Sequence, residues 1–159
     1  MGKLEKRPDL YSNVKHGVLM LPDKIEVSEP GTVDMVLTFR NIHNWMAREQ
    51  QHIAMKAFYE MLKPGGVLGV VEHRANPGTT MNEMKKSGYV TEEHAIEIAE
   101  KHGFTLVSKS EINANSKDSK DHPRGVWTLP PSLRLKEQDK QKYLNIGESD
   151  RMTLLFKKT

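Results

Sequence analysis

The chain has 159 residues, which suits one domain, and its formal net charge is only +3, from 24 basic and 21 acidic side chains. It contains no cysteine, which excludes disulfides and cysteine-bound metal ions. No apolar run approaches the roughly 20 residues that a membrane span needs, and no signal-peptide core follows the first residues. We therefore expect a soluble, cytoplasmic protein without a membrane partner, although a longer form could carry an export signal upstream.

The basic residues are scattered along the chain, and only 6% of all residues are aromatic. A nucleic-acid surface would favour a basic stripe with interleaved aromatic side chains. Apolar residues make up 36% and charged residues 28%, which is typical of a globular domain with a thin core. We therefore expect a solvated surface and no nucleic-acid partner.

The first half of the chain predicts a strand, a helix and a strand. A first strand is predicted over residues 14–21, and the apolar run at 33–39 is typical of a strand buried on both faces of a parallel sheet. Apolar side chains at helical spacing predict a helix over 47–62, which ends at Pro64 because proline cannot continue it. The wholly apolar segment 67–71 then completes a βαβ unit with a right-handed crossover.

The second half predicts further elements of both kinds. Thr91 is a good N-cap, and the glutamates that follow it suit the positive end of a helix dipole. The last segment alternates apolar and polar side chains, as a half-buried strand does. The predicted elements are a polar loop over 72–88, a helix over 91–102, a strand from 104 towards 112, a polar and mobile segment over 113–124, a short surface helix over 136–144 and a strand over 152–156.

These patterns together indicate an α/β fold with a mostly parallel sheet and a C-terminal antiparallel strand. Two segments also resemble landmarks of class I S-adenosylmethionine-dependent methyltransferases. VDMVLTFRNIHNW at 33–45 resembles the fourth strand of that family and its following loop, and FYEMLKPGG at 58–66 resembles the helix end before its fifth strand. LKPGG alone is a weak signal, but the two segments together are specific. The segment LTFRNIHNW at 37–45 is most similar to an uncharacterised bacterial methyltransferase-like family of unknown substrate.

The resemblance begins part-way through the family pattern. The glycine-rich loop after the first strand and the acidic residue after the second, which hold the cofactor in the family, have no counterpart in the sequence. This implies an incomplete Rossmann-like methyltransferase sheet over 1–159, as a single partial domain with strands 3 to 7 of the family fold: a fragment, a truncated relative or half of a split enzyme. The strand at 33–39 would then present an unpaired edge, which invites a homo-oligomer or an N-terminal partner fragment.

Ligands in open α/β sheets bind beyond the carboxyl ends of the strands, which here means the segments 39–45 and 72–75. The resemblance implies S-adenosylmethionine as the cofactor. An aromatic face suits a sulfonium, and a guanidinium suits a carboxylate of the cofactor or of an acidic substrate. The alternatives are that Phe39 belongs to the core and that Arg40 forms an ion pair with Asp34 or Glu72. The candidate cofactor-binding residues are Thr38, Phe39, Arg40 and Asn41.

His43 is the candidate catalytic base, because the pKa of histidine lies closest to neutrality, although a loop histidine can equally be polar surface. Trp45 fits packing at a helix start equally well, and residues 72–74 fit a solvated loop. Trp127 with Pro130 and Pro131 is a candidate lid, or simply a surface loop held by one indole. The candidate substrate-binding residues are Asn44, Trp45, Glu72, His73 and Arg74.

No metal site is predicted, because none of the seven histidines shows a typical ligand spacing. Nucleophile elbows and phosphate-binding glycine loops are also missing from the sequence, which argues against hydrolases. The leading hypothesis is a methyltransferase that acts on a small-molecule substrate. The alternative is a non-catalytic truncated domain that binds a protein through its exposed sheet edge. A nicotinamide-dependent fragment is disfavoured by the late antiparallel strand.

Overall fold

A computed structural model describes residues 6–159 and contains a four-stranded mixed sheet with the strand order β3-β4-β6-β5. Strands β3 and β4 are parallel and β6 is antiparallel to both of its neighbours, so β3, β4 and β5 run in one direction. The α/β class expected from the sequence is therefore confirmed, with a mixed sheet. The strands are β3 at Val33–Phe39, β4 at Leu62–His73, β5 at Phe104–Ser110 and β6 at Arg151–Lys158.

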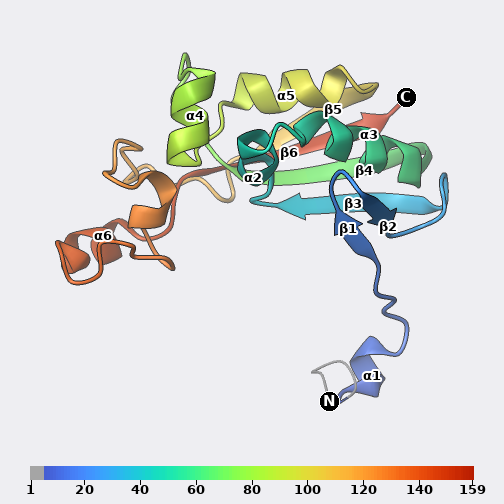
Figure 1. Ribbon diagram of the computed structural model, residues 1–159, viewed down its shortest axis with the longest axis horizontal. Coiled ribbons are helices and arrows are strands. Elements are labelled where there is room, and N and C mark those ends of the chain that lie inside the picture. Colours follow the sequence, from blue (N-terminus) through green and yellow to red (C-terminus); the bar gives the residue numbers. More distant parts are fainter. Residues whose placement is uncertain (1–5) are drawn as a thin grey trace.

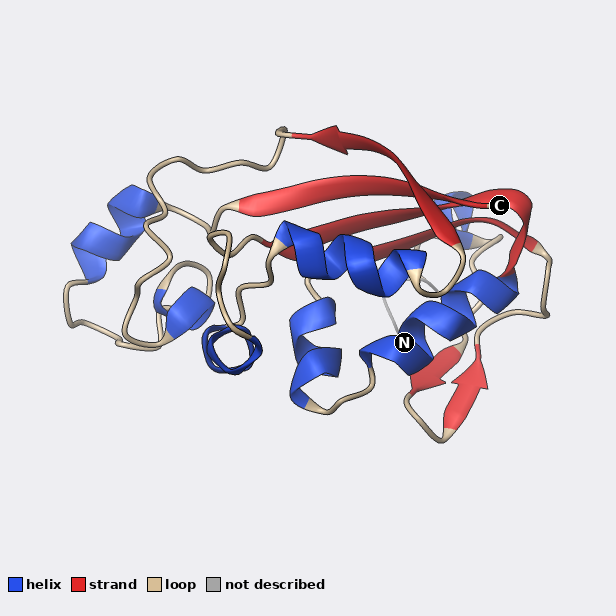
Figure 2. Ribbon diagram, turned by 90° about the horizontal axis from the view of Figure 1, so that it is seen from above, coloured by secondary structure: helices blue, strands red, loops and turns tan. Residues whose placement is uncertain are grey.

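The helices that follow β3 and β4 all pack on the same face of this sheet (Figures 1 and 2). Alternation along β6 explains the packing, because Met152, Leu154 and Phe156 point to the helices and are at most 1% exposed. Apolar stripes of α3 and α5 complete this core. The helices are α2 at Ile42–Ala47, α3 at Gln51–Met61, α4 at Met81–Ser87 and α5 at Glu92–Glu100.

The opposite face of the sheet carries apolar side chains that no described helix covers (Figure 2). Met35, Leu37 and Phe39 of β3 are 52%, 56% and 56% exposed. Gly69 of β4 leaves a shallow hollow beside them, where an added Cβ would lie 2.6 Å from the Leu37 side chain. Among the described residues, no strand pairs with the outer edge of β3. The sheet is thus asymmetric, with one packed face and one open face.

The helix predicted over 47–62 corresponds to α3, and helix α2 before it was not predicted. Glu49 adopts a left-handed backbone with φ of 58°, which no α-helix can include. The loop predicted over 72–88 contains α4, which the sequence reading missed. Thr80 and Glu83 form a capping box at its start, and Gly88 ends it in the left-handed conformation. The Thr-x-x-Glu spacing was the available signal for this helix.

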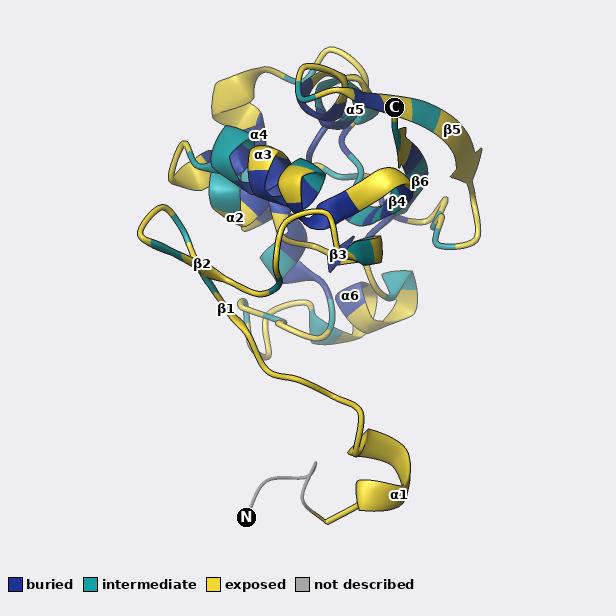
Figure 3. Cartoon of the chain, turned by 90° about the vertical axis from the view of Figure 1, so that its right-hand side faces the viewer, coloured by how far each residue is buried: buried dark blue, intermediate teal, exposed yellow. Residues whose placement is uncertain are grey.

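The strand predicted over 14–21 is shorter than expected and lies outside the main sheet. Strand β1 (Val18–Met20) pairs only with β2 (Lys24–Glu26) in a separate hairpin, because the turn at 21–23 reverses the chain at once. Helix α1 (Pro8–Tyr11) precedes this hairpin and is exposed (Figure 3). Over residues 6–159, no helix has the length and apolar character needed to cross a membrane.

The segment between β5 and β6 gathers at the end of the sheet where β4 terminates (Figure 1). It contains the short 3-10 helix η1 (Gly125–Thr128) and helix α6 (Lys140–Ile146), close to the surface helix predicted over 136–144. Gly125 lets η1 approach the end of α4, since a Cβ there would lie 2.0 Å from the carbonyl oxygen of Ser87. The residues predicted as a mobile segment over 113–124 are anchored by hydrogen bonds of Asn115 and Asp118.

We expect Leu154→Ala to lower the free energy of unfolding by about 2–5 kcal/mol, because it leaves a cavity under the helices. Leu155→Ala is the matched control, since Leu155 is the next residue of β6, is only half-buried and faces the open side. Its loss should cost about 1 kcal/mol. Urea unfolding followed by circular dichroism measures both values, and an equal cost would mean that the open face is packed in solution.

Candidate functional site

A pocket of about 210 Å³ lies at the carboxyl ends of β3 and β4, where residues 126–132 close over it. We call it the strand-end pocket. Strand β3 contributes Phe39, and Arg40 follows directly. Helix α2 contributes His43, and β4 contributes His73. Four residues that the sequence singled out are thereby brought together, with Trp127 and the two prolines that were proposed as a lid.

A buried histidine–glutamate pair forms the floor of this pocket. The Glu72 carboxylate is fully buried and accepts a hydrogen bond from His43 Nδ1 at 2.9 Å. It also accepts from the backbone N–H of His43 at 3.2 Å and of His73 at 2.8 Å. Because Nδ1 is engaged by Glu72, the Nε2 atom of His43 is the ring nitrogen left for the pocket. A carboxylate buried this deeply is tolerated only because these donors replace water.

The ring of His73 lies beside that of His43, with 5.2 Å between the centroids. Its Nδ1 atom is hydrogen-bonded to Ser149 Oγ. Burial, followed by the charges of His43, Arg151 and Arg40, lowers the pKa of His73 to about 3. The imidazole of His73 is therefore neutral over the physiological range. It lines the pocket as a hydrogen-bonding wall and not as a titrating group.

The remaining polar side chains of the wall are Ser132 and two guanidinium groups, and no side chain that lines the pocket is acidic. Arg40 has a left-handed backbone with φ of 58°, and its N–H donates to the carbonyl of Val71 at 2.7 Å, which fixes the end of β3 to β4. Arg151 starts β6 and pairs with Glu148, while its Nε atom is buried without a partner. Burial and then the charge of Arg40 lower the pKa of Arg151.

Arg151 was not a candidate in the sequence analysis, although a signal existed. Strand β6 is antiparallel to β4, so β6 begins at the edge of the sheet where β4 ends. A polar residue that opens such a strand is therefore placed next to residues that close the parallel strands. The distance between Arg40 and Arg151 along the sequence does not predict that they lie in one pocket, because more than a hundred residues separate them.

Three other candidates lie in a different hollow, which we call the edge pocket. This space of about 380 Å³ runs along the free edge of β3 and is lined by Thr38, Asn41 and Trp45 among others. Trp45 also packs edge-on against Phe58, as the packing alternative supposed. The Thr38 hydroxyl is buried and has no hydrogen-bond partner. Asn44 is exposed and lies in neither pocket; its side chain donates to the Arg40 carbonyl at 3.4 Å.

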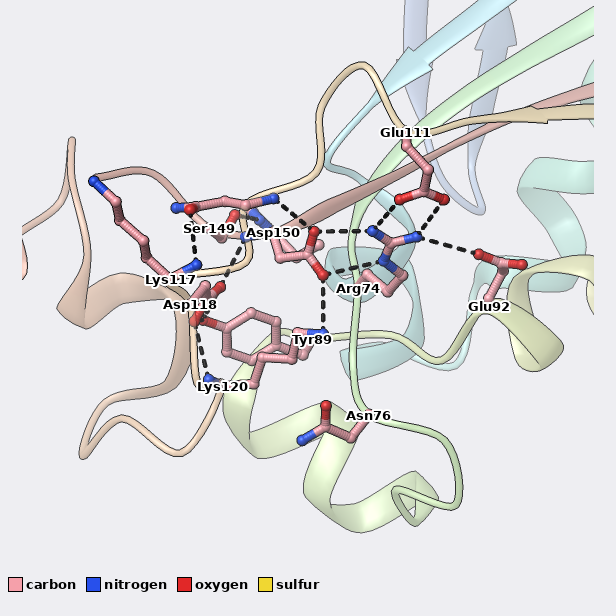
Figure 4. Close-up of polar contacts among 12 residues, drawn as sticks. Arg74, Asn76, Tyr89, Glu92, Glu111, Lys117, Asp118, Lys120, Ser149 and Asp150 are labelled. Atoms are coloured by element: carbon pink, nitrogen blue, oxygen red, sulfur yellow. Dashed lines mark hydrogen bonds and ion pairs between the residues drawn. The ribbon is translucent and has the colours of Figure 1, made fainter. Parts of the chain in front are cut away.

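Arg74 turns away from the strand-end pocket and ties the segment between β5 and β6 to the sheet (Figure 4). Its guanidinium donates to both carboxylate oxygens of Glu111, at 2.8 and 2.6 Å, and to Asp150 at 3.0 and 3.1 Å. Asp118, which is buried nearby, accepts hydrogen bonds from the Tyr89 hydroxyl and from the backbone of Asp150. This network holds the segment that carries Trp127 over the pocket.

His43, Glu72 and His73 also form the one group of potential metal ligands found among the described residues. One ligand atom from each lies within 4.8 Å of the others. Two histidines and one carboxylate are a known ligand set for divalent metals. The His43–Glu72 hydrogen bond and the two nearby guanidinium groups oppose the entry of a cation.

No protein-family profile matches the chain, and no curated protein matches it significantly. Solved structures do match. A protein from Galdieria sulphuraria, provisionally assigned as a sarcosine dimethylglycine methyltransferase, has a TM-score of 0.61 at 14% identity and covers 98% of this chain and 62% of its own. A methyltransferase dependent on S-adenosylmethionine from Methanosarcina mazei gives 0.52 at 11% identity, with 82% and 61% covered. The [4+2]-cyclase SpnF gives 0.51 at 15% identity, with 87% and 52% covered.

The chain therefore has the fold of class I S-adenosylmethionine-dependent methyltransferases, and it spans between 52% and 62% of the length of these three proteins. Identities of 11–15% carry the fold alone. One of the three is described as a cyclase, so the fold does not by itself fix the reaction. The argument for a function has to come from the site.

We expect Asp150→Asn to lower stability at neutral pH and to flatten its acid dependence. Burial alone would raise the pKa of Asp150, but hydrogen bonds from Arg74 and Lys120 outweigh it and lower the pKa to about 2. The charged carboxylate thus contributes stability above pH 3.8, and that contribution is lost as the pH falls towards 2. After allowance for solvent screening, we expect it to be about 1 kcal/mol.

Urea midpoints measured between pH 7 and pH 2 test this expectation, and Asp23→Asn in the exposed turn between β1 and β2 is the matched control. The wild type and the control should lose stability in parallel below pH 4. If Asp150→Asn loses it equally, the Arg74–Asp150 contact is not what stabilises the segment.

Proposed function

We propose that the chain carries the acceptor side of a methyltransferase that uses S-adenosylmethionine and a small-molecule substrate. The observation that carries the proposal is a pocket at the carboxyl ends of two parallel strands, floored by a buried histidine–glutamate pair, in a chain with the methyltransferase fold. Neither the fold nor the pair would suffice alone. The coincidence of both at one sheet edge favours group transfer over a purely structural role.

The residues at the end of β3 fit one part of the cofactor. In the edge pocket, Thr38 offers a buried hydroxyl that lacks a partner and Asn41 offers an amide. In the strand-end pocket, Phe39 offers an aromatic face for a sulfonium. The sequence contains no glycine-rich strand–turn–helix of the kind that holds the adenosine part in this fold. When bound, the cofactor supplies an electrophilic methyl carbon. The side chains of this chain have to align the acceptor with that carbon.

His43 is the group that can take a proton from a hydroxyl or amine acceptor, through the Nε2 atom left for the pocket. Glu72 holds the ring in one orientation and stabilises its protonated form, as an acidic partner of a histidine base does. Glu72 is fully buried, so we assign it a positioning role and not a direct contact with substrate. Trp127 and the adjacent prolines exclude water from one side of the pocket.

The open face and the free edge of β3 favour a second proposal about assembly. Met35, Leu37 and Phe39 expose more apolar surface than a solvated strand normally does, and the strand edge has unpaired backbone groups. A second copy of the chain or an N-terminal partner fragment would cover both. This assembly is compatible with catalysis, because the strand-end pocket opens at the strand tips. Light scattering after size exclusion measures the assembly directly.

We expect Thr38→Val to weaken S-adenosylmethionine binding roughly twofold to tenfold, because it removes one neutral hydrogen bond to the cofactor. The free protein should be equally stable or slightly more stable, since the buried hydroxyl has no partner there. Isothermal titration and urea unfolding measure the two quantities. Thr105→Val on the exposed surface of β5 is the control. A wild-type chain that binds no cofactor at millimolar concentration rejects the proposal for this chain.

We expect His43→Gln to reduce methyl transfer by about 10²–10⁴-fold while the cofactor affinity is unchanged, because it removes the proton acceptor and not the cofactor contacts. Transfer of radiolabelled methyl groups to a panel of small phenols, amines and acids measures the rate. His16→Gln, at an exposed position before β1, is the matched control. Retention of full activity by His43→Gln would remove His43 from the reaction.

A further inference from the structure

We propose that the strand-end pocket binds a small carboxylic acid, with the carboxylate held between Arg40 and Arg151 and the rest of the molecule directed at His43. The binding part of this inference stands on the pocket alone. The identification of the acid as a methyl acceptor rests on the proposed function.

Arg40 is available for a ligand. Its backbone is fixed at the tip of β3 by the hydrogen bond to Val71 and by its left-handed conformation. Within residues 6–159, its side chain forms no hydrogen bond or ion pair, so the alternative pairing with Asp34 or Glu72 is not observed. Asp34 pairs with Lys63 and Glu72 with His43. An arginine at a fixed place beside a pocket, with no acidic partner, is suited to an anion.

Arg151 supplies the second donor group. One end of its guanidinium pairs with Glu148, but the Nε–H is buried and has no acceptor. A buried donor without a partner is unfavourable, and a small turn of the guanidinium towards an acceptor in the pocket would relieve this. Arg40 and Arg151 line the same pocket, so their two positive charges repel each other across one space. A shared carboxylate would turn this repulsion into two attractive contacts.

The competing occupant of the same space is a divalent cation bound by His43, Glu72 and His73. Three observations disfavour it. Both guanidinium groups would repel a doubly charged ion. The Glu72 oxygens already accept hydrogen bonds from two backbone N–H groups and from His43. The Nδ1 atom of His73 is bound to Ser149. The charges and the satisfied carboxylate therefore favour an anion over a metal ion.

The size and walls of the pocket limit the acid. Its volume of about 210 Å³ exceeds the roughly 150 Å³ cavity that encloses benzene in a protein core, by about the room of a carboxylate. Phe39 and Trp127 provide aromatic walls. The guanidinium carbon of Arg134 lies over the Trp127 ring, 4.6 Å from its centroid. An acid with one aromatic ring fits these dimensions and walls. A ring hydroxyl or amine opposite the carboxylate would be directed at His43.

Tryptophan fluorescence tests the proposal directly, because the chain has only two tryptophans and Trp127 is the one in the pocket. The protein used is the full chain with Trp45→Phe, and the probes are benzoate, its neutral isostere benzamide, and zinc chloride. We expect benzoate to change the Trp127 emission saturably, and benzamide to bind at least tenfold more weakly. Zinc chloride should give no saturable change.

Arg40→Gln and Arg151→Gln should each weaken benzoate binding about tenfold or more and leave benzamide binding unchanged, since a hydrogen bond to a charged group is removed. Arg48→Gln at the end of α2 is the matched control. Arg40 is exposed, so its variant should fold even if the Arg151 variant does not. Equal binding of benzoate and benzamide, an unaffected Arg40→Gln variant, or tighter binding of zinc than of benzoate would each overturn the proposal.

The two proposals fail in different ways. Benzoate binding that depends on Arg40 in a chain that does not bind S-adenosylmethionine would support the acid site and reject the methyltransferase. Cofactor binding without arginine-dependent benzoate binding would reject the acid site and leave the methyltransferase standing. Because each ligand is titrated separately against the same variants, the two results are independent.

Discussion

The site depends on one buried carboxylate. Glu72 has no contact with solvent, and such a charge costs several kcal/mol unless donors replace its hydration. Those donors are the N–H groups of His43 and His73 and the ring of His43. They come from the start of α2 and the end of β4, so satisfying Glu72 also fixes where the helix after β3 begins. The orientation of the candidate base is therefore a consequence of the folding energetics.

The end of β4 distributes its side chains by the alternation of a strand. The Glu72 side chain faces the helices and that of His73 lines the pocket. Arg74, the first residue after the strand, binds Glu111 and Asp150. One three-residue segment thus orients the candidate base, lines the pocket and anchors the segment that covers it. A substitution at any of these positions should affect the other two through the backbone, which makes single-residue roles separable only with matched controls.

The sequence predicted the positions of β3 and of the last strand well, from an apolar run and from an alternating pattern. Its expectation that β3 is buried on both faces was wrong, because no described element covers Met35, Leu37 and Phe39. The sequence reading missed α2, because a helix of six residues is too short for an apolar spacing to reveal it. It also treated Arg40 and Arg74 alike, since each follows a strand. The fold distinguishes the two arginines. Arg74 forms ion pairs with Glu111 and Asp150, which are distant in sequence, whereas Arg40 forms none with an acidic side chain of residues 6–159. Pairings of this kind depend on tertiary contacts that no local pattern encodes.

The charge of the strand-end pocket connects the two proposals. A sulfonium cofactor is itself a cation, so it would be repelled by Arg40, which has no acidic partner among the described residues, and less by Arg151, which pairs with Glu148. A carboxylate between them offsets that repulsion, and the acid in turn gains from a cation beside it. Under the proposed function, acid and cofactor therefore bind with positive coupling, which by reciprocity is equal in both directions. A neutral acceptor would occupy the same space without this coupling. The two arginines therefore favour an acid in two ways: they bind its carboxylate directly, and the bound carboxylate then favours binding of the cofactor.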